Sequence, residues 1–204
     1  MLSGDLEIPQ HARGLVLFAH GSGSSRRSPR NQAVAEALRD AGVGTLLFDL
    51  LTPQEEMADA RTGHLRFDIG LLSRRLAIVT QEISDHPRAR NFGLGYFGAS
   101  TGGAAALRAA AALGANIQAV VSRGGRPDLA GDALTSVKSP TLLIVGERDE
   151  DVLRLNQKAF EQLTCEKSFA VVPHATHLFE EPGALEEVAR LAADWFRTHF
   201  KPRK

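Results

Sequence analysis

Six short apolar runs, spaced along the whole chain, place the strongest constraint on how this sequence can fold. Each run has the length of a buried strand, and amphipathic stretches with helical spacing separate them. The runs cover residues 15–19, 46–51, 92–97, 117–122, 140–145 and 168–172. Strands that alternate with helices favour a mostly parallel sheet covered by helices on both faces. We therefore predict an α/β fold with six to seven strands, the seventh being an edge strand near residues 6–8.

Start and stop signals bound the helices expected between these runs. Ser28-Pro29 is typical of an N-cap followed by the first helical residue. A long helix is expected from Leu65 to the residue before Pro87, because proline interrupts a helix. The polar residues 52–63 are expected to form a surface loop or a short helix. Further helices are expected over residues 103–113, 155–163 and 185–200, the last with Leu185, Val188, Ala192 and Trp195 facing the core.

Composition excludes several classes of protein. Lys+Arg and Asp+Glu number 24 each, so no net charge attracts the chain to nucleic acid or to an anionic membrane. Cys165 is the one cysteine, which excludes an intrachain disulfide and is compatible with a reducing compartment. We find neither a signal peptide nor an apolar stretch near the ~20 residues that span a bilayer. We expect one cytoplasmic domain over residues 1–204, monomeric or a small homo-oligomer, in which residues 1–14 are a polar extension or edge strand.

The sequence Gly98-Ala99-Ser100-Thr101-Gly102 joins the third apolar run to an alanine-rich helix. A serine at such a strand-to-helix turn has a strained backbone, and its hydroxyl stands clear of the sheet. Glycines on both sides let the strand and the helix pass closely. Other polar clusters also follow predicted strands, and the carboxyl ends of parallel strands share one edge of a sheet. We therefore predict that Ser100 is a nucleophile; the alternative is an ordinary serine in a glycine-rich turn.

A serine nucleophile needs a base, and the base works best when a third group fixes its tautomer. Asp149 follows the run at 140–145, and its rivals in the same loop are Glu147, Glu150 and Asp151. His174 and His177 follow the last run, and His177 lies farther into the loop, with room to reach Ser100. The predicted triad is Ser100 as nucleophile, His177 as base and Asp149 as the orienting group.

The loop His20-Gly21-Ser22-Gly23-Ser24 follows the first apolar run. Its glycines allow backbone amides to turn toward a substrate, so the Ser22 N–H is predicted to be one donor of an oxyanion hole. The second predicted donor is the N–H of Thr101, the residue after the nucleophile. His20, Gly21 and Gly23 are expected to contact substrate.

The same loop raises a rival interpretation. Gly21-x-Gly23, with Asp49 at the end of the next run, imitates a dinucleotide-binding fingerprint. However, Arg26 replaces the third glycine, and a helix that starts at Ser28 begins too late to hold a pyrophosphate beside Gly21. Asp49 is then expected to organise the loop.

Arg123 ends a predicted strand at the same edge of the sheet. We hypothesise that Arg123, with Arg26 or Arg27 as further candidates, binds an acidic group of the substrate. The alternative is a structural ion pair, for instance with Asp128 or Asp49.

Together, the loop at His20, the turn at Ser100, Gly146-x-x-Asp149 and the His177 loop resemble the α/β-hydrolase superfamily. Within it, the chain is similar over residues 15–200 to the small single-domain hydrolases of the dienelactone hydrolase type. The resemblance implies an acyl-serine mechanism with water as the second acceptor and with no cofactor or metal. Larger relatives insert a cap between the strands corresponding to 117–122 and 140–145. Here only the segment 128–139 joins them, so we expect no cap domain and a shallow, open pocket.

Dienelactone hydrolases proper have cysteine at the turn, whereas this chain has Ser100. The expected function is therefore carboxylesterase-like cleavage of small esters, or of related thioesters or lactones. Two other functions stay open: a dienelactone-type hydrolase of an anionic lactone, and a catalytically silent binding module. The expected partner is a small-molecule ester, with neither nucleic acid nor a membrane.

Overall fold

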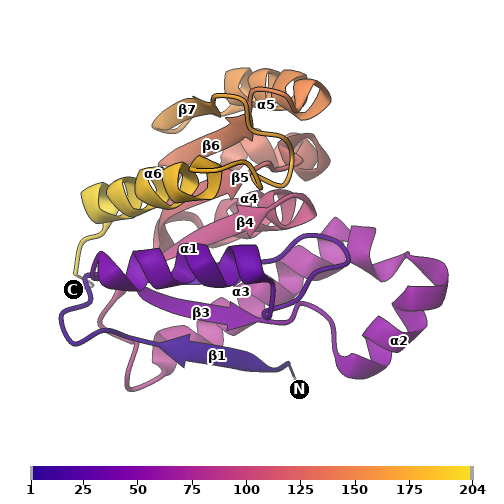
Figure 1. Ribbon diagram of the computed structural model, residues 1–204. Helices are drawn as coiled ribbons and strands as arrows, with labels where there is room; N and C mark the ends of the chain where they lie inside the picture. The colour runs from indigo at the N-terminus through magenta and orange to yellow at the C-terminus, as the bar shows by residue number, and fades with distance from the viewer. Residues whose placement is uncertain (1, 203–204) are drawn as a thin grey trace.

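The computed structural model describes residues 2–202, which form a seven-stranded sheet with helices on both faces (Figure 1). The strands are β1 (Gly4–Glu7), β2 (Gly14–Ala19), β3 (Gly44–Phe48), β4 (Gly93–Ala99), β5 (Ile117–Arg123), β6 (Thr141–Gly146) and β7 (Lys167–Val172). Their order in the sheet is β1-β3-β2-β4-β5-β6-β7. β1 is antiparallel to β3, and every other pair is parallel. The mostly parallel sheet is confirmed, and its edge strand lies two residues earlier than expected.

Two layers of helices enclose the sheet. α1 (Pro29–Asp40) and α6 (Ala184–His199) cover one face, and α3 (Ile69–Asp85), α4 (Thr101–Leu113) and α5 (Glu150–Gln162) cover the other (Figure 1). Alternate residues of β2 pack into the two layers: Leu15 and Leu17 contact the α3–α4 side, and Val16 and Phe18 contact the α1–α6 side. Burial on both faces explains why the strands are continuously apolar rather than alternating. In α6, Phe196 is fully buried, and Trp195, which we expected to face the core, is only half-buried.

The segment between β3 and α3 contains the short helix that was one of the two expectations for residues 52–63. Residues 53–62 form the helix α2 (Pro53–Thr62), which opens with a reciprocal capping box between Thr52 and Glu55. The 3₁₀ turn η1 (Leu65–Phe67) follows. The Asp68 side chain then accepts the Leu71 N–H at 2.8 Å, so α3 begins at Ile69 rather than at Leu65. α2 projects from the body beyond the carboxyl ends of the strands (Figure 1).

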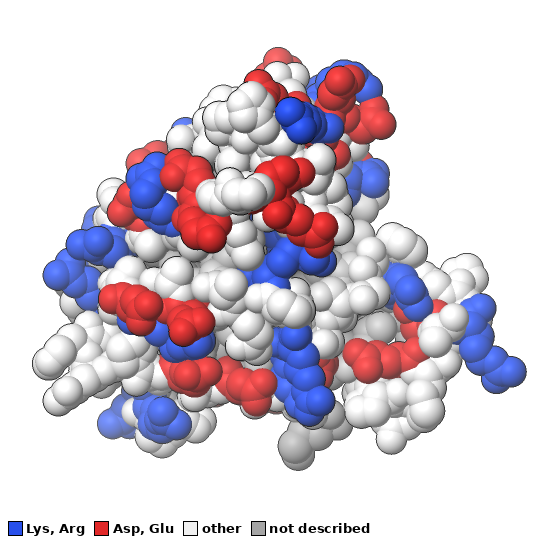
Figure 2. Space-filling view, in the orientation of Figure 1, with Lys and Arg blue, Asp and Glu red and all other residues white. Residues whose placement is uncertain are grey.

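The connection between β5 and β6 consists of the 3₁₀ turns of η3 (Pro127–Ser136), so no cap domain lies in this connection. On the face seen in Figure 2, acidic and basic side chains are interspersed, in keeping with their equal numbers in the sequence. Among residues 2–202, no helix is both long enough and apolar enough to cross a bilayer.

Candidate active site

Ser100 lies at the turn between β4 and α4 with φ 50° and ψ −121°. This is the strained conformation that the sequence predicts, and the surrounding backbone holds it. The Ser100 N–H donates to the Arg123 carbonyl oxygen at 3.3 Å, and its own carbonyl accepts the Gly103 N–H at 3.0 Å. A Cβ at Gly98 would lie 2.5 Å from the carbonyl oxygen of Gly102, so the close approach of strand and helix requires glycine.

The structure pairs the two predicted partners of Ser100 with each other. His177 Nδ1 lies 2.6 Å from Asp149 Oδ2, a geometry that directs the other ring nitrogen, Nε2, away from the carboxylate. The alternative base, His174, and one alternative acid, Glu147, also contact each other. His174 Nδ1 lies 3.2 Å from Glu147 Oε2, on an exposed part of the loop. His177 and Asp149 are therefore brought together at the site, while His174 braces its own loop.

Ser100 and His177 line one cavity of about 270 Å³. Among the residues described, no hydrogen bond joins the side chains of Ser100 and His177, and the His177 ring is held by Asp149 instead. The cavity opens at the carboxyl ends of the strands, where β4 and β5 supply Ala99 and Arg123. The remaining lining residues are Gly21, Ser22, Ser24, Ser28, Arg30, Asn31 and Leu178.

The two predicted oxyanion donors lie side by side, although 79 residues separate them in the sequence. The Ser22 N–H donates to Thr101 Oγ1 at 2.9 Å, a contact that the sequence analysis did not anticipate. This bond fixes the glycine-rich loop against the start of α4. In the free protein, the Ser22 amide is thus engaged by a neighbouring hydroxyl.

His20 was expected to contact substrate, but both of its ring nitrogens are bonded to backbone. Nε2 accepts the Leu50 N–H at 3.0 Å, so Nδ1 carries the proton and donates to the Gly21 carbonyl at 3.0 Å. The ring thereby ties the glycine-rich loop to the segment after β3. Gly21 and Gly23 lie on cavity walls, and His20 also lines the larger of the two cavities.

Burial lowers the pKa of His20 below its usual 6.5, because desolvation disfavours the imidazolium form. The unfolded chain therefore binds a proton near that pH that the folded chain does not. The free energy of unfolding is expected to be fully retained above about pH 6.5 and to decrease as the pH falls below it. Urea unfolding at about pH 7.5 and at about pH 5.5 measures this loss.

In His20→Gln, which has no titrating ring, the loss of stability between these two pH values should be smaller than in wild type. His64→Gln, at an exposed position on the surface, is the matched control and should leave the loss unchanged. An equal loss in wild type and His20→Gln would contradict this account of His20.

Asp49 organises the loop, as expected. Its carboxylate accepts the Arg26 N–H at 2.8 Å and pairs with the Arg26 guanidinium, which also contacts Asp5 at 3.1 Å. Arg26 is thus held by two carboxylates and is removed from the candidates for substrate binding.

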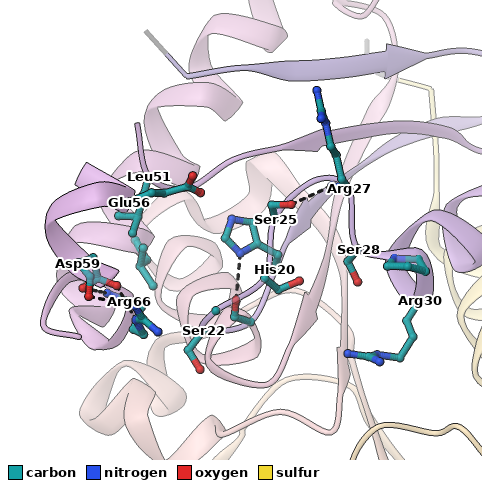
Figure 3. Close-up of a pocket in the computed structure, with 15 residues that line it drawn as sticks. His20, Ser22, Ser25, Arg27, Ser28, Arg30, Leu51, Glu56, Asp59 and Arg66 are labelled. Carbon is teal, nitrogen blue, oxygen red and sulfur yellow. Dashed lines mark hydrogen bonds and ion pairs between the residues drawn. The ribbon is translucent and has the colours of Figure 1, made fainter. Parts of the chain in front are cut away.

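A larger cavity of about 590 Å³ adjoins the first and shares Gly21, Ser22, Ser24, Ser28 and Arg30 with it. Figure 3 shows the serine-rich loop on one side and α2 with η1 on the other, and Arg30 reaching inward from the start of α1. Asp59 and Arg66 form an ion pair in the α2–η1 wall. The sequence analysis expected a surface loop or a short helix here, and the capping box at Thr52 was a readable signal of the helix.

Comparisons with known proteins agree with this fold. Residues 12–190 match the family model described as an alpha/beta hydrolase domain. The crystal structure of a dienelactone hydrolase from Anabaena variabilis is 58% identical, with a TM-score of 0.97 over 98% of this chain and 93% of that one. Est1E from Butyrivibrio proteoclasticus has a TM-score of 0.80 at 17% identity, over 97% of this chain and 94% of its own. That likeness concerns the fold alone.

Among curated proteins, a Mycobacterium tuberculosis protein is 58% identical over 98% of this chain. It is named, provisionally, as a phosphoribosyl transferase, and this chain spans 44% of its length. The match over 12–190 and the similarity to the Anabaena protein are decisive for the family. The chain belongs to the α/β-hydrolase family and, within it, to the proteins that resemble dienelactone hydrolase.

Proposed function

We propose that the protein is a serine hydrolase that cleaves small carboxylic esters through an acyl-Ser100 intermediate. One observation carries the proposal: the hydrogen bond of 2.6 Å between His177 and Asp149, at a cavity that the strained Ser100 also lines. In this arrangement the carboxylate holds the proton on Nδ1 and leaves Nε2 free to act as a base.

In the proposed mechanism, Ser100 Oγ attacks the ester carbonyl carbon while His177 Nε2 takes its proton. The carbonyl oxygen becomes an oxyanion that accepts hydrogen bonds from the Thr101 and Ser22 amides. For this, the Ser22 N–H exchanges the Thr101 hydroxyl for the substrate oxygen. The C–O bond then breaks, and His177 donates the proton to the departing alcohol. Water then attacks the acyl carbon while His177 takes its proton. The bond to Ser100 Oγ breaks, and His177 returns the proton to Oγ as the carboxylic acid leaves.

Labelling with a fluorophosphonate probe tests the proposal without knowledge of the natural substrate. Wild type should be labelled at Ser100, and Ser100→Ala should not be labelled at all. His177→Ala should react at least about 10³-fold more slowly, because the hydroxyl has lost its base. The rate is measured as the appearance of covalently labelled protein over time.

His174→Ala is the matched control, because His174 lies in the same loop and pairs with Glu147 instead of Asp149. It should be labelled at the wild-type rate. Wild type that neither reacts with the probe nor hydrolyses a short activated ester would refute the proposal and leave the binding-module function.

A lactone is the second candidate substrate class, because a lactone is an internal ester that the same steps would open. The 58% identical protein from Anabaena variabilis, described as a dienelactone hydrolase, supports it. Ring opening and ester cleavage differ only in whether the alcohol leaves or stays attached to the acyl group. The rates for small lactones and open esters measured side by side distinguish the two.

A further inference from the structure

The larger cavity, of about 590 Å³, has no role in the mechanism proposed above. The serine-rich loop, residues 22–28, forms one wall, and α2 with η1 forms the other (Figure 3). Its volume is in the range usual for pockets that hold small molecules. Ser100 and His177 are not among its described lining residues, but Ser22 lines this cavity and the one beside Ser100. A substrate that Ser100 attacks can therefore extend into the larger cavity.

Arg66 is a hydrogen-bond donor that the wall of this cavity holds in place. Asp59 is 2% exposed; its carboxylate pairs with the Arg66 Nε–H, and its carbonyl oxygen accepts from Nη2 at 2.9 Å. Nη1 has no acceptor among the described residues, and it lies 3.8 Å from the position that a Cβ at Gly23 would occupy. A buried carboxylate thus fixes an arginine whose remaining N–H groups face the serine-rich loop across the cavity.

Glu56 provides an acceptor on the same wall. Its carboxylate extends from α2 toward the serine-rich loop in Figure 3, and no hydrogen bond or ion pair engages it among residues 2–202. The opposite wall carries serine hydroxyls, which can both donate and accept: those of Ser22, Ser24 and Ser25. Leu51 and Leu72 add apolar surface. Free donors and free acceptors therefore face each other across the cavity.

The charges of the larger cavity cancel. Apart from the pair described above, Glu180 neutralises Arg30 at 3.0 Å, and Arg27 and Glu56 remain, with one charge of each sign. A ligand with a net charge would find no unbalanced partner there. Balanced charge with both donors and acceptors is suited to a neutral ligand rich in hydroxyl groups, because each hydroxyl donates one hydrogen bond and accepts others.

The smaller cavity differs in charge, because Arg123 has no carboxylate partner among residues 2–202. Asp49 pairs with Arg26, and Asp128 pairs with Arg126 at 2.8 Å. The ion pair of Arg123 with Asp128 or Asp49, which the sequence analysis left open, is therefore wrong. The balance of charge is a property of the larger cavity and not of the whole cleft.

We propose that the larger cavity binds a hydroxyl-rich, sugar-like group of the substrate and that Arg66 and Glu56 determine this specificity. The inference rests on the proposed function and names a substrate class for it, esters or lactones that carry several hydroxyl groups. Arg66 donates through Nη1 to one hydroxyl oxygen, and Glu56 accepts a hydrogen bond from another hydroxyl. The hydroxyl groups can belong to the acyl part or to the alcohol part of the ester, and the test separates these two sources.

Two pairs of substrates with matched carbon skeletons test the inference. D-galactono-1,4-lactone carries the hydroxyls on the acyl group, and γ-hexalactone is the same six-carbon lactone without them. 6-O-acetyl-D-galactose carries them on the alcohol, and hexyl acetate is its counterpart. Hydrolysis is followed by titrating the acid released at constant pH, and each kcat/KM is divided by the rate constant of the same compound with hydroxide. Wild type should favour the hydroxylated member of at least one pair by about 10- to 100-fold.

Glu56→Gln removes the charged acceptor, and Arg66→Lys keeps a cation beside Asp59 but lacks the Nη1 donor. Each should lower kcat/KM for the preferred hydroxylated substrate by about tenfold and leave its counterpart within about twofold of wild type. Glu36→Gln is the matched control, because Glu36 is an exposed glutamate on α1 that is not among the residues lining the cavity. It should keep the whole preference.

The absence of a preference in both pairs would overturn the inference. So would Glu56 and Arg66 variants that lose activity equally on both members of the preferred pair, since that describes a role in the fold. A preference in the lactone pair alone upholds the site and places the hydroxyls on the acyl group, and one in the acetate pair alone places them on the alcohol.

Fluorophosphonate labelling of the same samples separates this inference from the proposed function. Labelled Ser100 without a preference refutes only the hydroxyl-binding site. Unlabelled protein that hydrolyses neither γ-hexalactone nor hexyl acetate refutes the proposed function and this inference together.

Discussion

Asp149→Asn is expected to lower kcat for ester hydrolysis by about 10⁴-fold with the fold intact. The Asp149 carboxylate accepts a hydrogen bond from His177 Nδ1–H at 2.6 Å, which keeps the proton on Nδ1 and the lone pair on Nε2. An asparagine amide can instead donate to Nδ1, and the ring proton then moves to Nε2, where it blocks the base. Steady-state kinetics with a short activated ester measure the loss, and circular dichroism checks the fold.

Glu147→Gln is the control for this substitution. Glu147 lies in the same loop, but it contacts the backbone and ring of the exposed His174. Its substitution should leave kcat within about twofold of wild type, because surface changes away from the site have small effects. An Asp149→Asn variant that keeps a tenth or more of wild-type activity would show that another acid orients His177.

Gly102→Ala is expected to remove most of the free energy of unfolding. A Cβ at Gly102 would lie 2.6 Å from the carbonyl oxygen of His20 and closer still to that of Ala19. These are backbone atoms of β2 and its loop, so they cannot rotate away as a side chain would. A loss above about 4 kcal/mol is expected, a large part of what a domain of this size has. Urea unfolding, or the yield of folded protein, measures it.

Gly70 provides a matched control, because Gly70 and Gly102 are each the second residue of a helix. A Cβ at Gly70 would lie 3.2 Å from the tips of Arg74 and Asp68, which are side-chain atoms with room to move. Gly70→Ala should stay within about 1 kcal/mol of wild type, helped by the better helix propensity of alanine. Equal stability of the two variants would refute the close-approach role of Gly102.

The sequence was sufficient for the features that depend on local chemistry. Continuous apolar runs identified the strands, and glycines around Ser100 predicted the strained turn that the structure contains. The choice of His177 over His174 needed only a judgement of loop length, and the structure places Asp149 beside the chosen residue. α2 agrees with the short helix that was one of two expectations for residues 52–63, whereas the expected start of α3 at Leu65 was wrong, because Asp68 was readable as an N-cap but was not used.

Features that depend on contacts between distant segments could not be predicted. The Ser22 amide meets the hydroxyl of Thr101 only because β2 and β4 are neighbours in the sheet. Arg123 lacks a carboxylate because Arg26 and Arg126 hold the available ones, which no spacing in the sequence reveals. That α2 forms one wall of the larger cavity could not be predicted either, because its polar residues resemble those of an ordinary surface helix.

The position of β4 in the sheet determines which kind of unfolding exposes its backbone amides to solvent. Three strands lie on each side of it, so the strand that carries Ser100 is the farthest from either edge. Local fraying of a protein begins at exposed margins and involves little of its interior. Backbone amides of β4 should therefore exchange with solvent deuterium only through global unfolding, while those of β1 exchange through local openings. Ser100, the proposed nucleophile, follows β4 directly and should therefore lie beside the slowest-exchanging part of the chain, so that partial unfolding at the edges is expected to leave its geometry intact.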